Sequence, residues 1–286
     1  MYPSNKKGEI MINVKDLHIR DPFFYFEDGY YYLYSSFQDK NDIYPSFVCY
    51  KTKDLINFEE PKTIFKRPND FWATKDFWAP EMHKYKGKYY LFASLKSEDK
   101  CRATQIFVSN KPDGEYKTLT DKPITPSHLE CLDGTLFVEN DIPYIVYCNE
   151  WLQVKDGKMF AQRLSDDLKE TIGDPILLFR ASEAKWTIPF SQEGNYVTDG
   201  PFIIKRNNKL NMIWSSFAKD GYAVGVCESE SILGPWVHKE DPIYKQNGGH
   251  AMVYKKNDEL LMTLHCPNEP FGDERLVLLP LKDYLK

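Results

Sequence analysis

The sequence predicts an all-β fold, a five-bladed β-propeller with about four antiparallel strands per blade. One hairpin pattern recurs five times, and almost no segment shows the 3.6-residue apolar period of a surface helix. An α/β barrel would need eight amphipathic helices, and a β-sandwich would not explain a fivefold recurrence. The copies run from about residue 18 to the C-terminus, so we expect residues 1–286 to form a single propeller domain.

Each copy begins with an acidic or polar residue, continues as an apolar strand, turns, and returns as a strand rich in aromatic residues. Turn signals such as Asp28-Gly29 or Asn207-Asn208 separate the two strands, as in a β-hairpin. In chain order the copies are RDPFFYFEDGYYYLYSSF from Arg20, APEMHKYKGKYYLFASLK from Ala79, LDGTLFVENDIPYIVYCNEW from Leu132, TDGPFIIKRNNKLNMIWSSF from Thr198 and GGHAMVYKKNDELLMTLHCPN from Gly248.

A weaker second pair of strands follows the first four copies, which completes a four-stranded unit in each case. The last copy is followed only by RLVLLPLKDY. We expect the N-terminal run EIMINV to add a strand to this last blade and so to help close the ring.

Composition excludes several classes of protein. The chain has 37 Lys and Arg against 42 Asp and Glu, a net charge of −5, which argues against a nucleic-acid partner with its basic stripe. No apolar run approaches the ~18 residues of a membrane span, so no membrane partner is expected. None of the six cysteines sits in a CxxC pair, which indicates free buried thiols rather than a zinc or redox site.

The N-terminal residues MYPSNKKGEI contain no apolar stretch of the kind found in a secretory signal. We therefore expect a cytoplasmic protein as the chain stands, or a periplasmic or secreted one if a signal has been removed. The oligomeric state cannot be deduced from the sequence.

The leading residue of each copy is a candidate for a site on the propeller axis, because the innermost strand of every blade lines that axis. Gathering carboxylates there is costly, since like charges raise each other's pKa, so a fold without a use for them would not keep them. Carboxylates, hydroxyls and aromatic rings together suit a sugar, and a carboxyl pair can hydrolyse a glycosidic bond. The five leading residues are Asp21, Glu81, Asp133, Asp199 and His250.

At these residues the sequence resembles glycoside hydrolase family 43, the five-bladed propeller arabinosidases and xylosidases. The resemblance implies an inverting mechanism, with Asp21 as the general base that activates water and Asp133 as the carboxylate that orients the acid and tunes its pKa. The matching motifs are Arg20-Asp21-Pro22-Phe23, Trp78-Ala79-Pro80-Glu81, Leu132-Asp133-Gly134, Asp199-Gly200-Pro201-Phe202 and Gly248-Gly249-His250.

The general acid is the point at which the sequence departs from the family pattern. The family normally has Glu in a Glu-Gly-Pro motif, whereas this chain has Asp199, one methylene shorter, before Gly200-Pro201. Either Asp199 is a shorter-reaching acid, or Glu150 supplies the proton from the Asn149-Glu150-Trp151 turn. A third alternative is a chain that keeps the pocket but has lost activity.

The remaining candidates bind substrate. We expect Trp78, Glu81, Trp151, Ser36 and His250 to contact the sugar, although each could instead serve packing, a turn or the rim. No metal or cofactor is required, and the resemblance allows a hydrated structural Ca²⁺ near His250.

The function expected is that of an exo-acting, inverting glycosidase. It would remove terminal α-L-arabinofuranosyl or β-D-xylosyl residues from plant-type polysaccharides or oligosaccharides. The alternatives are a related propeller hydrolase acting on galactose- or fructose-type sugars and a non-catalytic carbohydrate-binding propeller. Loops within residues 66–78 and 180–197 should determine the sugar and the linkage.

Overall fold

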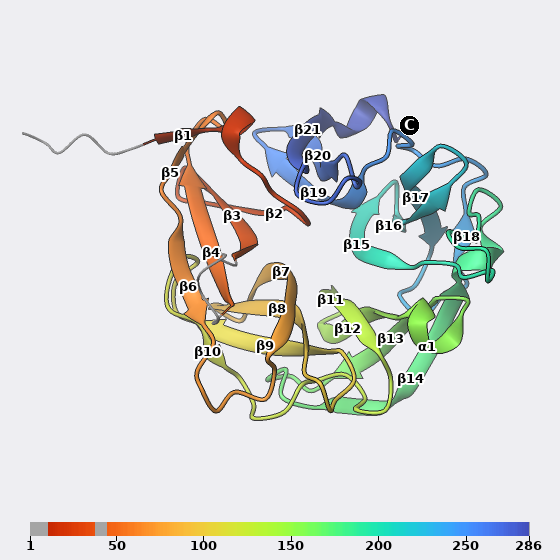
Figure 1. Ribbon diagram of the computed structural model, residues 1–286, viewed down its shortest axis with the longest axis horizontal. Helices are drawn as coiled ribbons and strands as arrows, with labels where there is room; N and C mark the ends of the chain where they lie inside the picture. The colour runs from red at the N-terminus through yellow and green to blue at the C-terminus, as the bar shows by residue number, and fades with distance from the viewer. Residues whose placement is uncertain (1–10, 38–44, 286) are drawn as a thin grey trace, which may run out of the picture.

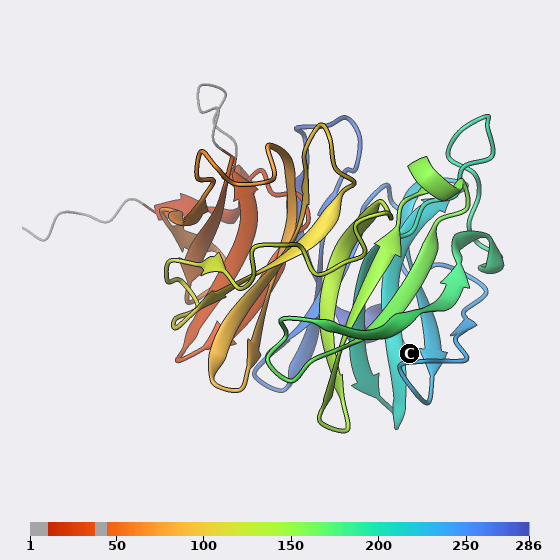
Figure 2. The same cartoon turned by 90° about the horizontal axis from the view of Figure 1, so that it is seen from below.

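The computed structural model describes residues 11–37 and 45–285. Its strands form five antiparallel sheets arranged as blades around a central axis (Figure 1). The predicted five-bladed propeller is confirmed. Seen from the side, the sheets stand next to one another and their connecting loops gather at the two faces of the ring (Figure 2).

The first three blades have six, four and four strands. The first contains β1 (Met11–Asn13), β2 (Phe23–Glu27), β3 (Tyr30–Phe37), β4 (Ser46–Thr52), β5 (Asn57–Glu59) and β6 (Lys62–Lys66). The second contains β7 (Lys75–Tyr85), β8 (Lys88–Lys96), β9 (Ala103–Ser109) and β10 (Lys117–Thr118). The third contains β11 (Cys131–Glu139), β12 (Ile142–Asn149), β13 (Lys158–Leu164) and β14 (Thr171–Arg180).

The last two blades have four and three strands. The fourth contains β15 (Asp199–Arg206), β16 (Lys209–Ala218), β17 (Gly221–Ser229) and β18 (Val237–His238). The fifth contains β19 (Gly249–Lys256), β20 (Glu259–Cys266) and β21 (Arg275–Pro280). Helical turns are short: α1 (Trp151–Val154), η1 (Val14–Asp16), η2 (Ala181–Glu183) and η3 (Leu281–Asp283).

A bulge near the start of the innermost strand repeats in the second to fifth blades. In β15, for example, Asp199 pairs with Ser215 and Phe202 with Ile213, so the inner strand holds one residue more than its partner. A residue with positive φ lies at each of these bulges and, in the first blade, just before β2, and this conformation re-aims the side chain. These residues are Asp21 (51°), Ala79 (44°), Asp133 (53°), Gly200 (50°) and His250 (54°).

The bulges correct two of the five expected equivalences. Glu81 lies two residues after the bulge residue Ala79, and Asp199 lies one residue before Gly200, so neither is the register counterpart of Asp21. The physical reason is that the positive-φ conformation repeats from blade to blade, whereas in these two blades the acidic residue does not occupy the positive-φ position.

The expected position of the N-terminal strand is also wrong. β1 pairs with β5 at the outer edge of the first blade, where Met11 faces Glu59, and not with the last blade; the first two residues of EIMINV lie outside the described residues. Side chains therefore join the last blade to the first. The Tyr254 ring lies 5.0 Å from that of Phe24 and 6.0 Å from that of Tyr31, between ring centroids.

A third correction concerns the loops expected within residues 66–78, a range that includes Phe77 and Trp78. Both lie inside β7, because this strand begins at Lys75, and Phe77 is buried in the core.

The core consists of apolar clusters packed between neighbouring sheets, with Trp214 among the fully buried side chains. Four of the six cysteines are buried and none forms a disulfide, as expected. Within the described residues, no helix has the length and apolar character needed to cross a membrane.

Two substitutions of Tyr254 test the contact between the last and first blades. Tyr254→Ala should lower the free energy of unfolding by about 3–5 kcal/mol, because it removes a buried ring from an aromatic cluster. Tyr254→Phe should be neutral or stabilising, because the buried hydroxyl has no hydrogen-bond partner among the described residues. Denaturant unfolding of the two variants measures both effects, and a loss above ~1 kcal/mol in Tyr254→Phe would contradict the second expectation.

Candidate active site

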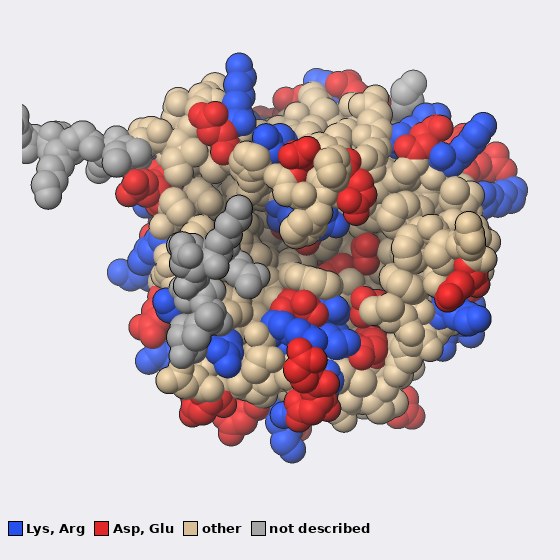
Figure 3. Space-filling model, viewed as in Figure 1, with Lys and Arg blue, Asp and Glu red and all other residues tan. Residues whose placement is uncertain are grey.

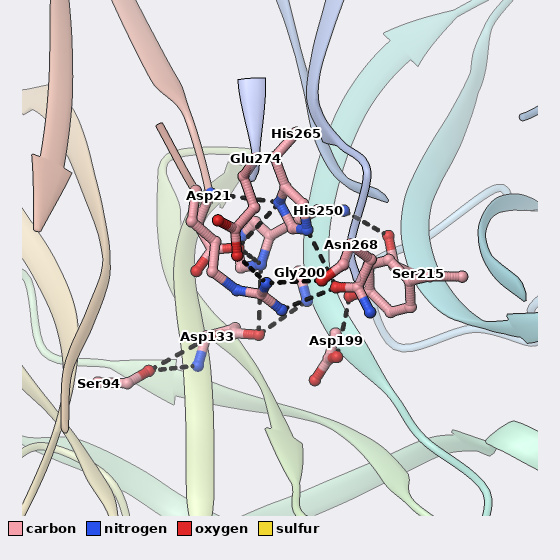
Figure 4. Close-up of polar contacts among 12 residues, drawn as sticks. Asp21, Ser94, Asp133, Asp199, Gly200, Ser215, His250, His265, Asn268 and Glu274 are labelled. Carbon is pink, nitrogen blue, oxygen red and sulfur yellow. Dashed lines mark hydrogen bonds and ion pairs between the residues drawn. The ribbon is translucent and has the colours of Figure 1, made fainter. Parts of the chain in front are cut away.

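Asp21 is held by two histidines of the last blade. Its Oδ1 lies 3.1 Å from Nδ1 of His250 and 3.2 Å from Nδ1 of His265, and its backbone nitrogen lies 3.3 Å from the same His265 atom (Figure 4). Burial alone would raise the pKa of Asp21, but the charge and hydrogen bonds of His250 and His265 hold it well below its usual range. Asp21 is therefore a carboxylate at neutral pH.

Asp133, on β11, is fixed by its neighbours on both sides. Its backbone N–H donates to Oγ of Ser94 at 2.8 Å, and its Oδ2 accepts the backbone N–H of Gly200 at 2.9 Å. Burial raises the pKa of Asp133, and the nearby charges of Asp21 and Glu81 raise it further, against the opposing effect of His250. This carboxyl group thus lies in contact with the fourth blade.

Gly200 makes that contact possible because it has no side chain. A Cβ on Gly200 would lie 2.9 Å from Cγ of His250, and the φ of 50° is one that other residues rarely adopt. The Gly in Asp199-Gly200-Pro201 is therefore a steric requirement of the axis.

Asp199 is the first residue of β15, and its carboxyl group accepts a hydrogen bond from a neutral donor. The hydroxyl of Tyr222 donates to its Oδ2 at 2.9 Å. Burial and the adjacent Asp133 raise the pKa of Asp199 to about 7, while His250 and the Tyr222 hydrogen bond act in the opposite direction. A carboxylic acid with this pKa retains its proton near neutral pH, as a general acid must.

His250 supplies the positive charge among these carboxyl groups. Burial lowers its pKa, but Asp21 and Asp133 outweigh burial and raise the pKa to about 10. Its Nδ1 lies 3.8 Å from Oδ2 of Asp133, and its backbone N–H donates to Oγ of Ser215 at 2.8 Å. The imidazolium is therefore part of the site's electrostatics at neutral pH.

A further set of polar contacts supports Asp21 and His265. Arg20 donates to Oε1 of Glu274 and to Oδ1 of Asn268, both at 2.8 Å, and that Asn268 oxygen lies 3.2 Å from Nε2 of His265. Arg20 stands beside Asp21 in the first motif, which is the signal that could have drawn attention to it.

Sequence reasoning did not identify Tyr222 or Glu274. Neither residue stands among the leading motifs: Tyr222 meets Asp199 across the sheet of the fourth blade, and Glu274 meets Arg20 only when the last blade lies beside the first.

Glu150 lies outside this cluster, in an ion-paired group at the mouth. Its Oε2 lies 3.2 Å from Nε of Arg102, whose Nη2 lies 3.1 Å from Oδ2 of Asp76. Burial raises the pKa of Glu150, whereas Arg102 lowers it. The Arg102 guanidinium also lies 3.8 Å from the ring centroid of Trp78, whose side chain remains 41% exposed.

The other three predicted residues lie at different levels of the ring. Glu81 is buried, with Oε2 3.3 Å from Nε2 of His83, deeper along β7 than Trp78. Ser36 is exposed near the end of β3, and Trp151 is half-buried at the start of α1. The viewed face is hollowed at its centre, with acidic side chains in the hollow (Figure 3).

The residues near His250 do not fit a calcium ion bound by protein side chains. Among the described residues, no group of three or more His, Cys, Asp or Glu side chains is arranged to hold a metal ion. His250 is protonated and directed at Asp21, so it offers no lone pair there, and Ca²⁺ needs ~6–8 oxygen ligands.

Comparison with known proteins assigns the chain to a family. The sequence profile described as Glycosyl hydrolases family 43 matches residues 13–276. The chain belongs to this family. The expectation of a glycosidase that hydrolyses O-glycosyl bonds is thereby confirmed at the level of the family, and so is the resemblance seen in the motifs.

Solved structures share the fold closely. The crystal structure of an endo-arabinase from Bacteroides thetaiotaomicron is 40% identical, with a TM-score of 0.87 over 94% of this chain and 96% of that one. Among sequence relatives, Xylosidase/arabinosidase 43A of Humicola insolens is 26% identical, covering 91% of this chain and 79% of that protein.

A second Humicola insolens relative, Alpha-L-arabinofuranosidase 43, is 24% identical over 77% of this chain. The chain spans only 46% of that relative's length.

The hydroxyl of Tyr222 tests the pKa of Asp199. Tyr222→Phe keeps the ring, which stacks on His265, but removes a hydrogen bond that lowers the pKa of Asp199. The pKa should rise, and the alkaline limb of the kcat/KM profile should move to higher pH. Hydrolysis of an aryl glycoside across pH 5–10 measures this, and an unmoved or lowered limb would contradict the assignment.

Proposed function

We propose that this family 43 chain hydrolyses α-L-arabinofuranosyl linkages with inversion of configuration, using Asp21 as general base and Asp199 as general acid. The observation that carries the proposal is the opposite protonation of two carboxyl groups in one site. His250 and His265 hold the pKa of Asp21 low, so this group is ionised at neutral pH. Burial and the charge of Asp133 raise the pKa of Asp199 to about 7, so this group still carries its proton.

The reaction is a single displacement. Asp21 takes a proton from a water molecule as the water oxygen bonds to the anomeric carbon. The glycosidic C–O bond breaks on the opposite face, and Asp199 transfers its proton to the leaving oxygen. Asp133 raises the pKa of Asp199 by charge repulsion and, through the Gly200 N–H, is linked to the backbone next to the acid.

The geometry favours Asp199 over Glu150 as the acid. Figure 4 shows Asp199 apart from Asp21, and a base and an acid that act on opposite faces of a sugar must lie apart. Glu150 is instead engaged by Arg102, so we assign it the role of holding Arg102 beneath Trp78. Trp78 would then offer its exposed face to the sugar.

The sugar proposed rests on the relatives. The 40% identical structure is named an endo-arabinase, and the second Humicola insolens relative described above is named an arabinofuranosidase. A β-D-xylosyl linkage is the second candidate, because the other Humicola relative is named a xylosidase/arabinosidase. Exo action, the contacts of Glu81, Ser36 and Trp151 with substrate, and the compartment stay predictions; two relatives are called extracellular. A hydrated Ca²⁺ near His250 also stays a prediction. Its ligands would be water molecules, and the proposed reaction does not use it.

The leaving group separates the two catalytic roles. Asp21→Asn should reduce kcat by about 10²–10⁴-fold on every substrate, because water always needs the base. Asp199→Asn should cause a comparable loss on arabino-oligosaccharides but a much smaller one on dinitrophenyl arabinofuranoside, whose leaving group departs without a proton. Steady-state kinetics on both substrates, with circular dichroism to check folding, decide the matter. Activity that survives Asp21→Asn would refute the base, and equal losses in Asp199→Asn would refute the acid.

Glu150→Gln is the matched comparison for the rival acid. We expect it to raise KM, because Trp78 loses part of its support, while the alkaline limb of the pH profile persists near pH 7. If Glu150 were the acid, this variant would lose the limb and regain activity with the dinitrophenyl leaving group. The pH dependence of kcat on both substrates distinguishes the outcomes.

A further inference from the structure

Four aromatic rings form a continuous row along the mouth between the third and fourth blades. The centroid separations are 5.3 Å from Tyr222 to Phe217, 5.3 Å from Phe217 to Phe190, and 4.6 Å from Phe190 to Trp151. We call these four residues the aromatic row. It begins at Asp199, because the Tyr222 hydroxyl donates to that carboxyl group.

The row lies at the face where the site opens. Phe217 is near the end of β16, two residues beyond Ser215, which pairs with Asp199. Trp151 starts α1 directly after β12, and the loop carrying Phe190 is bonded to the fourth blade by Ile188 N–H to the Phe217 carbonyl at 2.9 Å. Three separate segments thus bring their rings together at this rim.

Exposure distinguishes three of the four rings from core packing, whereas Tyr222 at the inner end of the row is 3% exposed. Rings that serve only the core of the fourth blade are closed to solvent, as Trp214 is at 0%. Phe190 is 39% exposed, its neighbour Ile188 is 41% exposed, and Phe217 and Trp151 are half-buried. An apolar strip that is open on one side and begins at a buried carboxyl group is suited to a ligand.

We propose that the aromatic row binds the sugar units on the leaving-group side of the scissile bond, so that the substrate is a chain of several sugars. The direction follows from the chemistry. Asp199 protonates the leaving oxygen, so the departing part of the substrate must extend from Asp199 away from Asp21. The row extends from that carboxyl group along the rim.

This inference rests on the proposed function and adds the length of the substrate to it. Sugar rings have apolar C–H faces that pack on aromatic faces, and burying that surface stabilises the complex in proportion to its area. Binding energy from such remote units can be used at the reacting bond, so losing it should reduce kcat/KM for long substrates.

Phe190→Ala tests the row, because Phe190 is its most exposed member and lies outside the catalytic cluster. The substrates are linear α-1,5-arabino-oligosaccharides of two to six units and 4-nitrophenyl α-L-arabinofuranoside. In the native chain, kcat/KM should rise with chain length. In Phe190→Ala, the ratio of kcat/KM for the hexamer to that for the aryl glycoside should fall about tenfold.

Val237→Ala is the control, since Val237 is a 68% exposed apolar residue on β18 of the same blade and should leave the ratio unchanged. An unaltered ratio in Phe190→Ala would overturn the inference, as would equal losses on both substrates. If the native chain hydrolyses neither arabinofuranosides nor xylosides, the proposed function fails. Calorimetric titration of native and Phe190→Ala protein with the hexamer then decides the row, and equal affinities would refute it.

Discussion

The contact between the His250 imidazolium and the Asp21 carboxylate, 3.1 Å long, is the interaction on which the rest of the site depends. Three carboxyl groups are buried close together here, and without a cation their mutual repulsion would favour protonation of all of them. The positive charge of His250 instead allows one carboxyl group to be ionised while another stays protonated. Asp21 stays ionised, while Asp199, which has a tyrosine hydroxyl rather than a histidine against it, keeps its proton to about pH 7. A base and an acid can therefore share one hollow.

The backbone enforces that arrangement. Asp21, Asp133 and His250 share a positive φ near the start of their inner strands, and in the fourth blade that conformation falls on Gly200, so the acidic residue stands one position earlier. This offset separates Asp199 from the others and gives it a different hydrogen-bond partner. Asp199, the proposed acid, accordingly has its own local environment, in which the Tyr222 hydroxyl donates to its side chain.

The fivefold hairpin pattern was sufficient to predict the propeller and the gathering of Asp21, Asp133, Asp199 and His250, because blade geometry follows from periodicity. It was not sufficient for the register of Glu81 and Asp199, which depends on bulges that the residue types do not reveal. Tyr222, Glu274 and the pairing of β1 with β5 escaped for another reason: each depends on contacts between segments far apart in the chain. The choice between Glu150 and Asp199 likewise needed the position of Arg102, whose ion pairs occupy the former.

Among the described residues no strand of the last blade pairs with a strand of the first, and this junction has a consequence for how the protein matures. Asp21 emerges near the beginning of synthesis, but His265, which contacts its backbone nitrogen, follows 244 residues later. Until that final blade is made and docked, the earliest catalytic carboxyl group has an ordinary affinity for protons. Most of the ring can therefore form before Asp21 has its low pKa. Docking of the last blade both closes the ring and lowers the pKa of Asp21.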